Sequence, residues 1–231
     1  MGQMMEARMH DGVFIGVYRA DPRGTPRAGI VIMHEAFGMN DHIRDMCERY
    51  AAEGYLALAP ALYDRVQKGV EVPGYSDEDL VLGRELRQGV EWEPSVADMR
   101  TIIDLAREAG AVGVVGYCWG GSLAWLAATR CGADAAVSYY GGQIIQFIDE
   151  RPGCPFMAHF AEHDIHVPPE SAAMVQRHHP GVPVYMYDAN HGFNCDQRAD
   201  YDAQSAALAQ KRTFEFLATN LAAARTAAAG E

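Results

Sequence analysis

A cysteine stands at the centre of the pattern Gly-x-Cys-x-Gly at positions 116–120. The pattern follows the apolar run 112–116 and opens a stretch rich in small residues at 120–124. Strand, sharp turn and helix in this order are typical of a nucleophile elbow, here with Cys118 in the place of serine. The flanking glycines let two chain segments cross closely, and the start of a helix favours thiolate over thiol. The sequence therefore predicts that Cys118 is a nucleophile.

A cysteine nucleophile of this kind needs a histidine base and an acid that orients it. In sheets with such an elbow the acid follows the nucleophile in the chain and the histidine comes last. The loop after one apolar run offers Asp164 and Glu162, of which Asp164 is preferred. The loop after the last run offers His191, which is followed by Gly192. Because parallel sheets place their active sites at the carboxyl ends of the strands, we expect these side chains to meet Cys118 there.

Metal binding is the alternative chemistry for the histidines. His163, Asp164 and His166 lie together, but the sequence offers no obvious further ligand. The His-Glu pair at 34–35 begins a zinc-protease pattern, yet position 38 is glycine, which excludes a zinc protease. Five cysteines are scattered without a Cys-x-x-Cys pair, which speaks against structural zinc and a disulfide framework. We therefore expect no metal and no cofactor.

Apolar runs of strand length must position these residues, and they alternate with helical patterns. The runs cover 13–18, 29–33, 55–59, 112–116, 135–139, 155–160 and 182–187. Helical patterns begin near Asn40 or Asp41, after the Pro-Ser pair at 94–95, at Trp119 and in the C-terminal part. Several runs are continuously apolar, as in strands that are covered on both faces. The sequence predicts an α/β fold with a mainly parallel twisted sheet and helices on both faces.

The chain has 231 residues, of which 49% are apolar and 22% charged, and this suits one globular domain over 1–231. No linker-like change of composition divides it. The polar segment 64–93 is weakly patterned, and we interpret it as an excursion or cap over the sheet. The Ala-rich end, 222–231, is expected to fray.

The charge balance restricts the classes of molecule that the protein is expected to bind. With 19 Lys and Arg against 31 Asp and Glu, the net charge is −12, which disfavours nucleic acid and anionic membranes. There is no run of 18 apolar residues that could span a bilayer, and the first residues lack the apolar core of a signal peptide. A cytoplasmic enzyme with a small-molecule substrate is expected, and the choice between monomer and dimer stays open.

Four stretches together resemble the dienelactone hydrolase family (carboxymethylenebutenolidases) of the α/β-hydrolase fold, and the resemblance extends over about 11–221. They are His-Glu-Ala-Phe-Gly at 34–38, Pro-Ala-Leu-Tyr at 60–63, Gly-Tyr-Cys-Trp-Gly-Gly at 116–121 and Asn-His-Gly-Phe at 190–193. The resemblance implies about eight strands, no large lid and a triad of Cys118, Asp164 and His191.

The resemblance also implies a role for Glu35. In this family the glutamate at that position contacts the resting thiol and takes its proton when substrate binds; the alternative is a solvated loop carboxylate. The oxyanion hole is expected from the backbone N–H groups of Ala36, after the 29–33 strand, and Trp119, at the helix start.

The chain departs from the family at the substrate anchors. Family members of the chlorocatechol pathway hold the substrate carboxylate with two arginines. Leu80 stands at the first of these positions, with Arg84 one turn later, and Cys195 at the second, with Arg198 three residues further on. Arg84 and Arg198 are either replacements from neighbouring positions or ordinary surface charges.

The predicted function is hydrolysis of a small ester or lactone through a thioester on Cys118. A general carboxylesterase or thioesterase of the same fold is the nearest alternative. A non-catalytic protein that binds a ligand in the same crevice is the alternative from another class, and the complete set of Cys, His, Asp and Glu argues against it.

Overall fold

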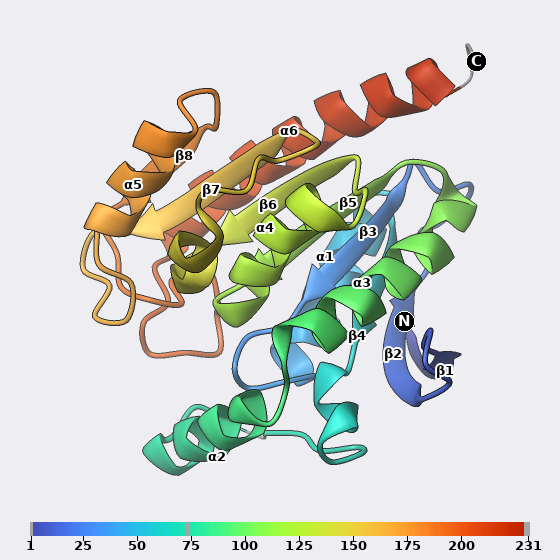
Figure 1. Ribbon diagram of the computed structural model, residues 1–231, viewed down its shortest axis with the longest axis horizontal. Helices are drawn as coiled ribbons and strands as arrows, with labels where there is room; N and C mark the ends of the chain where they lie inside the picture. Colours follow the sequence, from blue (N-terminus) through green and yellow to red (C-terminus); the bar gives the residue numbers. More distant parts are fainter. Residues whose placement is uncertain (1, 73, 229–231) are drawn as a thin grey trace.

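Eight strands form one sheet in the order β1-β2-β4-β3-β5-β6-β7-β8 in the computed structural model, which describes residues 2–72 and 74–228 (Figure 1). β1 and β2 pair antiparallel, as do β2 and β4, and all the other neighbouring strands are parallel. The strands are β1 Gln3–Arg8, β2 Phe14–Ala20, β3 Gly29–Met33, β4 Leu56–Pro60, β5 Val112–Tyr117, β6 Ala135–Tyr139, β7 Phe156–Ala161 and β8 Val184–Tyr187. The predicted, mainly parallel sheet is confirmed.

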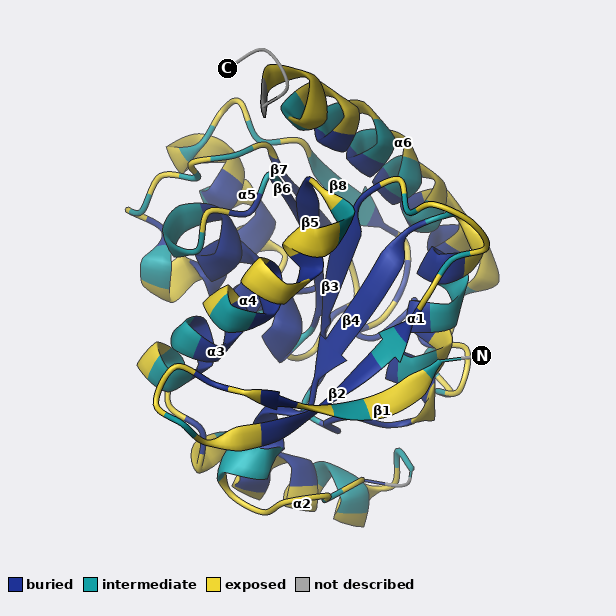
Figure 2. Ribbon diagram, turned by 90° about the vertical axis from the view of Figure 1, so that its right-hand side faces the viewer, coloured by how far each residue is buried: buried dark blue, intermediate teal, exposed yellow. Residues whose placement is uncertain are grey.

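Six α-helices cover the sheet and its carboxyl edge over the described residues. They are α1 Asp41–Ala52, α2 Asp77–Gln88, α3 Trp92–Ala106, α4 Trp119–Arg130, α5 Glu170–His178 and α6 Ala203–Ala228, with short 3-10 turns at Leu62–Arg65, Arg107–Ala109 and Gly142–Phe147. Figure 2 shows α3, α4 and α5 on one side of the sheet and α1 and α6 on the other. None of these helices is both long and apolar enough to cross a membrane.

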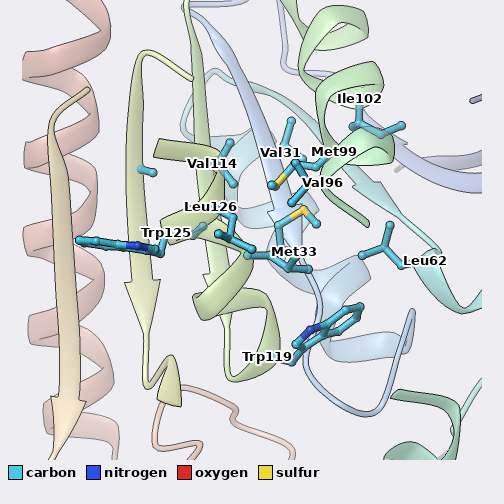
Figure 3. Packing of buried hydrophobic residues seen from close by; sticks show 14 of the residues in the cluster. Val31, Met33, Leu62, Val96, Met99, Ile102, Val114, Trp119, Trp125 and Leu126 are labelled. Carbon is cyan, nitrogen blue, oxygen red and sulfur yellow. The ribbon is translucent and has the colours of Figure 1, made fainter. Parts of the chain in front are cut away.

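Each face of the sheet has its own apolar core. On one face, residues of α3 and α4 pack against alternate residues of the strands; Figure 3 shows part of this cluster, with Trp119 near its end. On the other face, α1 and α6 pack against the remaining strand residues. Because both faces are buried, β3, β4, β5 and β6 contain only buried residues. This explains the continuous apolar runs of the sequence.

The strand register brings the functional loops to one edge. Met33 at the end of β3 pairs with Gly116, and Tyr117 at the end of β5 pairs with Tyr139 at the end of β6. Further along, Ala161 pairs with Tyr187 at the ends of β7 and β8. The loops that follow these strands therefore leave the sheet side by side.

β1 and α2 were not predicted from the sequence, for the same physical reason. β1 is an edge strand in which Ala7 alone is buried, and it pairs with β2 through its backbone, so it has no apolar run. The segment 64–93, interpreted as an excursion, contains α2, in which Gly83 and Leu86 are the buried residues. An element that buries so few residues is easily taken for a polar loop.

The starts of α1 and α3 lie within a few residues of the positions predicted from the sequence. Asn40 is the cap of α1, since its side chain accepts a hydrogen bond from the Ile43 N–H at 3.2 Å. α3 begins at Trp92, ahead of Pro94, because proline is tolerated in a first turn where its missing N–H has no partner. The tail expected to fray from 222 is helical to Ala228, and 229–231 lie outside the described residues.

Candidate active site

Cys118 lies on a strained turn between β5 and α4. Its φ of 55° and ψ of −115° are rare for a residue with a side chain. The turn is possible because a Cβ atom at Gly116 would overlap the backbone carbonyl of Gly120, and one at Gly120 would overlap that of Met33. The Gly120 N–H also donates to the His34 carbonyl at 3.1 Å, which ties the elbow to the loop after β3. Backbone crossings therefore set the position of the thiol.

Asp164 and His191 form a buried pair beside the elbow. The Nδ1–H of His191 donates to Oδ2 of Asp164 at 2.6 Å. The backbone N–H groups of His166 and Val167 donate to Oδ1 at 2.7 and 2.8 Å. Burial alone would raise the pKa of Asp164, but these hydrogen bonds to the carboxylate lower it below the ordinary value. The carboxylate is thus held ionised and aimed at the imidazole.

His191 also interacts electrostatically with the side chain of Cys118. Burial opposes the charged imidazolium, yet the interactions with Cys118 and Asp164 raise the pKa of His191 above its ordinary value. The ring of Tyr140 packs against the imidazole with the centroids 4.9 Å apart. The structure therefore brings together Cys118, His191 and Asp164, the three residues expected from the sequence.

Glu35 is 2% exposed, which rules out a solvated loop carboxylate. Its Oε1 accepts a hydrogen bond from the Tyr140 hydroxyl at 3.1 Å, and its Oε2 lies 3.9 Å from Nη1 of Arg198. Among the described residues no hydrogen bond joins Glu35 to Cys118, in contrast to the contact that the family resemblance implied. Tyr140 and Arg198 each interact electrostatically with both Glu35 and Cys118. The carboxylate thus lies next to the nucleophile and is held by a tyrosine and an arginine.

The expected oxyanion donors line the same cavity. The peptide that joins Glu35 to Ala36 is fixed because its carbonyl accepts hydrogen bonds from His34 Nδ1 at 2.7 Å and from the Gly38 N–H at 3.2 Å. Within the described residues the N–H groups of Ala36 and Trp119 have no hydrogen-bond acceptor. Two preorganised, unused donors beside a nucleophile are the arrangement that stabilises an oxyanion.

A cavity of about 190 Å³ opens above Cys118. It is lined by Ala36, Phe37, Leu80, Arg84, Arg87, Cys118, Trp119, Gln143, His166, His191 and Arg198. The cavity brings Arg84 and Arg198 to the site, although they are far apart in the sequence. It also contains Arg87, which the sequence analysis missed. Arg87 follows Arg84 by three residues, so the two share one face of a helix. This could have indicated Arg87 only if a helix had been predicted there.

No three His, Cys, Asp or Glu side chains are arranged as metal ligands in the part of the chain that the structure describes. Of the histidines near the site, His163 forms an exposed pair with Asp188 at 2.6 Å, and His166 packs edge to face against His191. The carboxylate of Asp164 is already occupied by His191 and by two backbone N–H groups.

Comparison with known proteins shows what this chain is similar to. The model of the dienelactone hydrolase family matches residues 15–221. The chain belongs to the dienelactone hydrolase family. A carboxymethylenebutenolidase from Pseudomonas putida is 32% identical over 219 residues, which cover 90% of this chain and 93% of the relative. The chain is therefore a hydrolase of this family.

Solved structures agree on the fold. The crystal structure of a protein assigned as a dienelactone hydrolase from Klebsiella pneumoniae is 26% identical with a TM-score of 0.84, covering 94% of this chain and 98% of the other. The Pyrococcus furiosus esterase Pf2001, at 14% identity and a TM-score of 0.66 over 96% of this chain and 93% of the other, shares the fold alone. The α/β-hydrolase fold of this member of the dienelactone hydrolase family is thus confirmed.

Proposed function

We propose that this protein hydrolyses a small ester or lactone, with Cys118 as nucleophile, His191 as base and Asp164 as the acid that orients the base. The observation that carries the proposal is the hydrogen-bonded pair of Asp164 and His191 beside Cys118, which lies on a strained elbow. A carboxylate held on one ring nitrogen leaves the other nitrogen to exchange a proton with the nucleophile.

In the first half of the reaction, Sγ of Cys118 attacks the ester carbonyl carbon. The thiol proton passes to His191 or Glu35, and the N–H groups of Ala36 and Trp119 bind the oxyanion. When the C–O bond to the leaving group breaks, the leaving oxygen, or the enolate of an opened lactone, takes a proton. A thioester on Cys118 remains.

In the second half, His191 removes a proton from water, and the hydroxide attacks the thioester carbonyl. The same two N–H groups stabilise the second oxyanion. The C–S bond breaks, the sulfur recovers a proton from His191, and the carboxylic acid leaves. Each turnover consumes one ester and one water and needs no cofactor.

Glu35 is proposed to control the protonation of the nucleophile. In the resting site its charge is balanced by Arg198 at 3.9 Å, and its Oε2 accepts no hydrogen bond within the described residues. A substrate carboxylate that binds Arg198 would release Glu35 from this pairing and leave it free to accept the thiol proton. This fits a substrate that carries a carboxylate. A general carboxylesterase or thioesterase would use the same site without that requirement.

The proposal extends to the whole chain as a single catalytic domain that works in the cytoplasm on a small molecule, without nucleic acid. Its direct test is to trap the thioester. The protein is mixed with p-nitrophenyl acetate and quenched in acid within milliseconds, and its peptides are analysed by mass spectrometry. We expect an acetyl group on the peptide that contains Cys118 and a matching burst of p-nitrophenol. Hydrolysis with no acylated Cys118 under these conditions would contradict the mechanism.

A further inference from the structure

The cavity above Cys118 is strongly cationic in a chain whose net charge is −12. Three arginines line it, namely Arg84, Arg87 and Arg198, and none of its described lining residues is Asp or Glu. One substrate carboxylate, even if bound by two hydrogen bonds to one guanidinium, leaves part of this positive charge unused.

Arg198 lies in the segment between β8 and α6 and packs near two aromatic rings. Its guanidinium lies 5.6 Å from the centroid of the Phe37 ring and 5.7 Å from that of Tyr75. It already has two carboxylate neighbours, Glu35 at 3.9 Å and Asp200 at 3.5 Å.

Arg87, on α2, packs against a different pair of aromatic rings, one at the start of α4 and one at the start of α3. Its guanidinium lies 4.6 Å from the centroid of the Trp119 ring and 4.5 Å from that of Trp92. Its one hydrogen bond is from Nη1 to the Val90 carbonyl at 2.7 Å, and it has no carboxylate neighbour among the described residues. Burial lowers the pKa of Arg87, since the charge is partly desolvated there without a counter-ion.

Arg84 stands one helical turn before Arg87 on α2, and residues three apart share a helix face. It is exposed at the cavity and takes part in no hydrogen bond or ion pair within the described residues. The ring neighbours of Arg87 and Arg198 are different residues, and both arginines interact electrostatically with Cys118. A substrate bound at Cys118 therefore lies near two cationic groups that are held separately.

We propose that Arg87 and Arg84 form a second anion subsite, apart from Arg198, and that the preferred substrate carries an anionic group on each side of the ester bond. The substrate class is a half-ester or lactone of a dicarboxylic acid with a further carboxylate on the alcohol side. This inference rests on the proposed esterase function and narrows its substrate.

The test uses four esters that combine two acyl groups with two leaving groups. The acyl group is butyryl or glutaryl, and the leaving group is 4-carbamoylphenol or 4-hydroxybenzoate, so that the set holds a neutral ester, two monoanions and one dianion. KM and kcat are measured for wild type, Arg84→Gln, Arg87→Gln and Arg198→Gln. For each ester, KM and kcat of a variant are divided by the wild-type values, so that differences in intrinsic reactivity between the esters cancel.

We expect the dianion to have the lowest KM with wild type. Arg198→Gln should weaken binding of one of the two anionic groups roughly tenfold relative to the neutral ester, and Arg87→Gln the other, because each loses a charge-assisted contact. Arg84→Gln should act on the same group as Arg87→Gln and to a smaller extent. Since Arg84 is exposed and has no hydrogen-bond or ion-pair partner within the described residues, this variant keeps the test valid if Arg87→Gln disturbs the tryptophans. Arg177→Gln, on the exposed part of α5, makes the same change of charge away from the cavity and is the control.

Two outcomes would overturn the inference. The first is a dianion that binds no better than the better monoanion. The second is that Arg87→Gln and Arg198→Gln weaken the same anionic group, which would mean one shared carboxylate. Failure of the proposed function looks different, because none of the four esters would then be hydrolysed.

Discussion

The two walls of the cavity are built in different ways. The elbow wall rests on the sheet, and its residues are held by backbone crossings at Gly116 and Gly120 that leave no room for a Cβ atom. The α2 wall lies apart from the sheet in Figure 1. It is attached through the buried Leu86 and through Gly83, whose backbone approaches the Ala36 carbonyl, while Val81 is 53% exposed.

The two walls therefore suit two different tasks, which are catalysis and substrate selection. Groups that make and break bonds need fixed geometry, and the sheet edge supplies it through strand ends in register. Groups that select the substrate can lie on a helix that buries few residues, because substitution of an exposed side chain there costs little unfolding free energy. Arg84 and Arg87 are on that helix.

The largest effect is expected at the centre of the elbow wall. Cys118→Ala should lower kcat/KM at least roughly a thousandfold with the fold intact, as for other covalent catalysts. Cys154→Ala is the control; burial raises the pKa of Cys154 to about 12, so it should neither matter for turnover nor react with iodoacetamide. Steady-state kinetics and labelling of wild type, followed by peptide mapping, test both statements. Substantial activity in Cys118→Ala would remove the nucleophile from the proposal.

The next effect is on stability. Gly116→Ala places a Cβ atom in the backbone of Gly120, where no side chain can move aside, and should cost about 3 kcal/mol or more of unfolding free energy. Gly181→Ala is the matched control, because a Cβ atom at Gly181 would have no neighbour within 4 Å. Urea unfolding of the two variants measures the difference. Equal stabilities would mean that the elbow is less tightly constrained than the crossing implies.

A smaller effect is expected from Glu35→Gln, which keeps the shape and removes the charge. A negative neighbour disfavours a second anion, so the variant should contain more thiolate at a given pH and be inactivated faster by peroxide. Turnover should nevertheless fall, roughly a hundredfold, if Glu35 must take the proton.

The measurement is a pH titration of thiolate ultraviolet absorbance, with Cys118→Ser as the blank. Glu162→Gln, an exposed acid on the loop after β7, is the control for loss of charge. If wild type and Glu35→Gln titrate together, activation of the thiol returns to His191 alone.

The smallest effect is expected in the α2 wall. Ser76 and Asp79 form a capping box at the start of α2, in which the Ser76 side chain accepts from the Asp79 N–H at 3.2 Å and Asp79 accepts from the Ser76 N–H at 3.1 Å. Ser76→Ala should cost about 1 kcal/mol, and only locally. Hydrogen exchange of the α2 amides should quicken, while the midpoint of global unfolding hardly moves. Ser76→Thr keeps the cap and should exchange like wild type; a global loss of stability in Ser76→Ala would show that α2 is part of the cooperative core.

Much of the elbow wall was readable from the sequence. The glycine spacing around Cys118 is typical of a sharp turn between a strand and a helix. The continuous apolar runs in the sequence are typical of buried parallel strands. Asp164 and His191 follow such runs at the sheet edge, so fold class and chain order together were enough to nominate them. The family resemblance added Glu35 and the two oxyanion donors.

Tertiary structure decided the rest. The pairing of Glu35 with Tyr140 and Arg198, in place of a bond to Cys118, depends on loops that are far apart in the chain. Helix α2 was not predicted because it buries few of its residues, and Arg87 was therefore not assigned to the site. A hydrophobic period records which face of an element is covered; it does not record where an exposed arginine comes to lie. The sequence therefore predicted the catalytic residues and named Arg84 and Arg198, whereas Arg87 could be assigned to the cavity only when the tertiary structure placed α2 beside it.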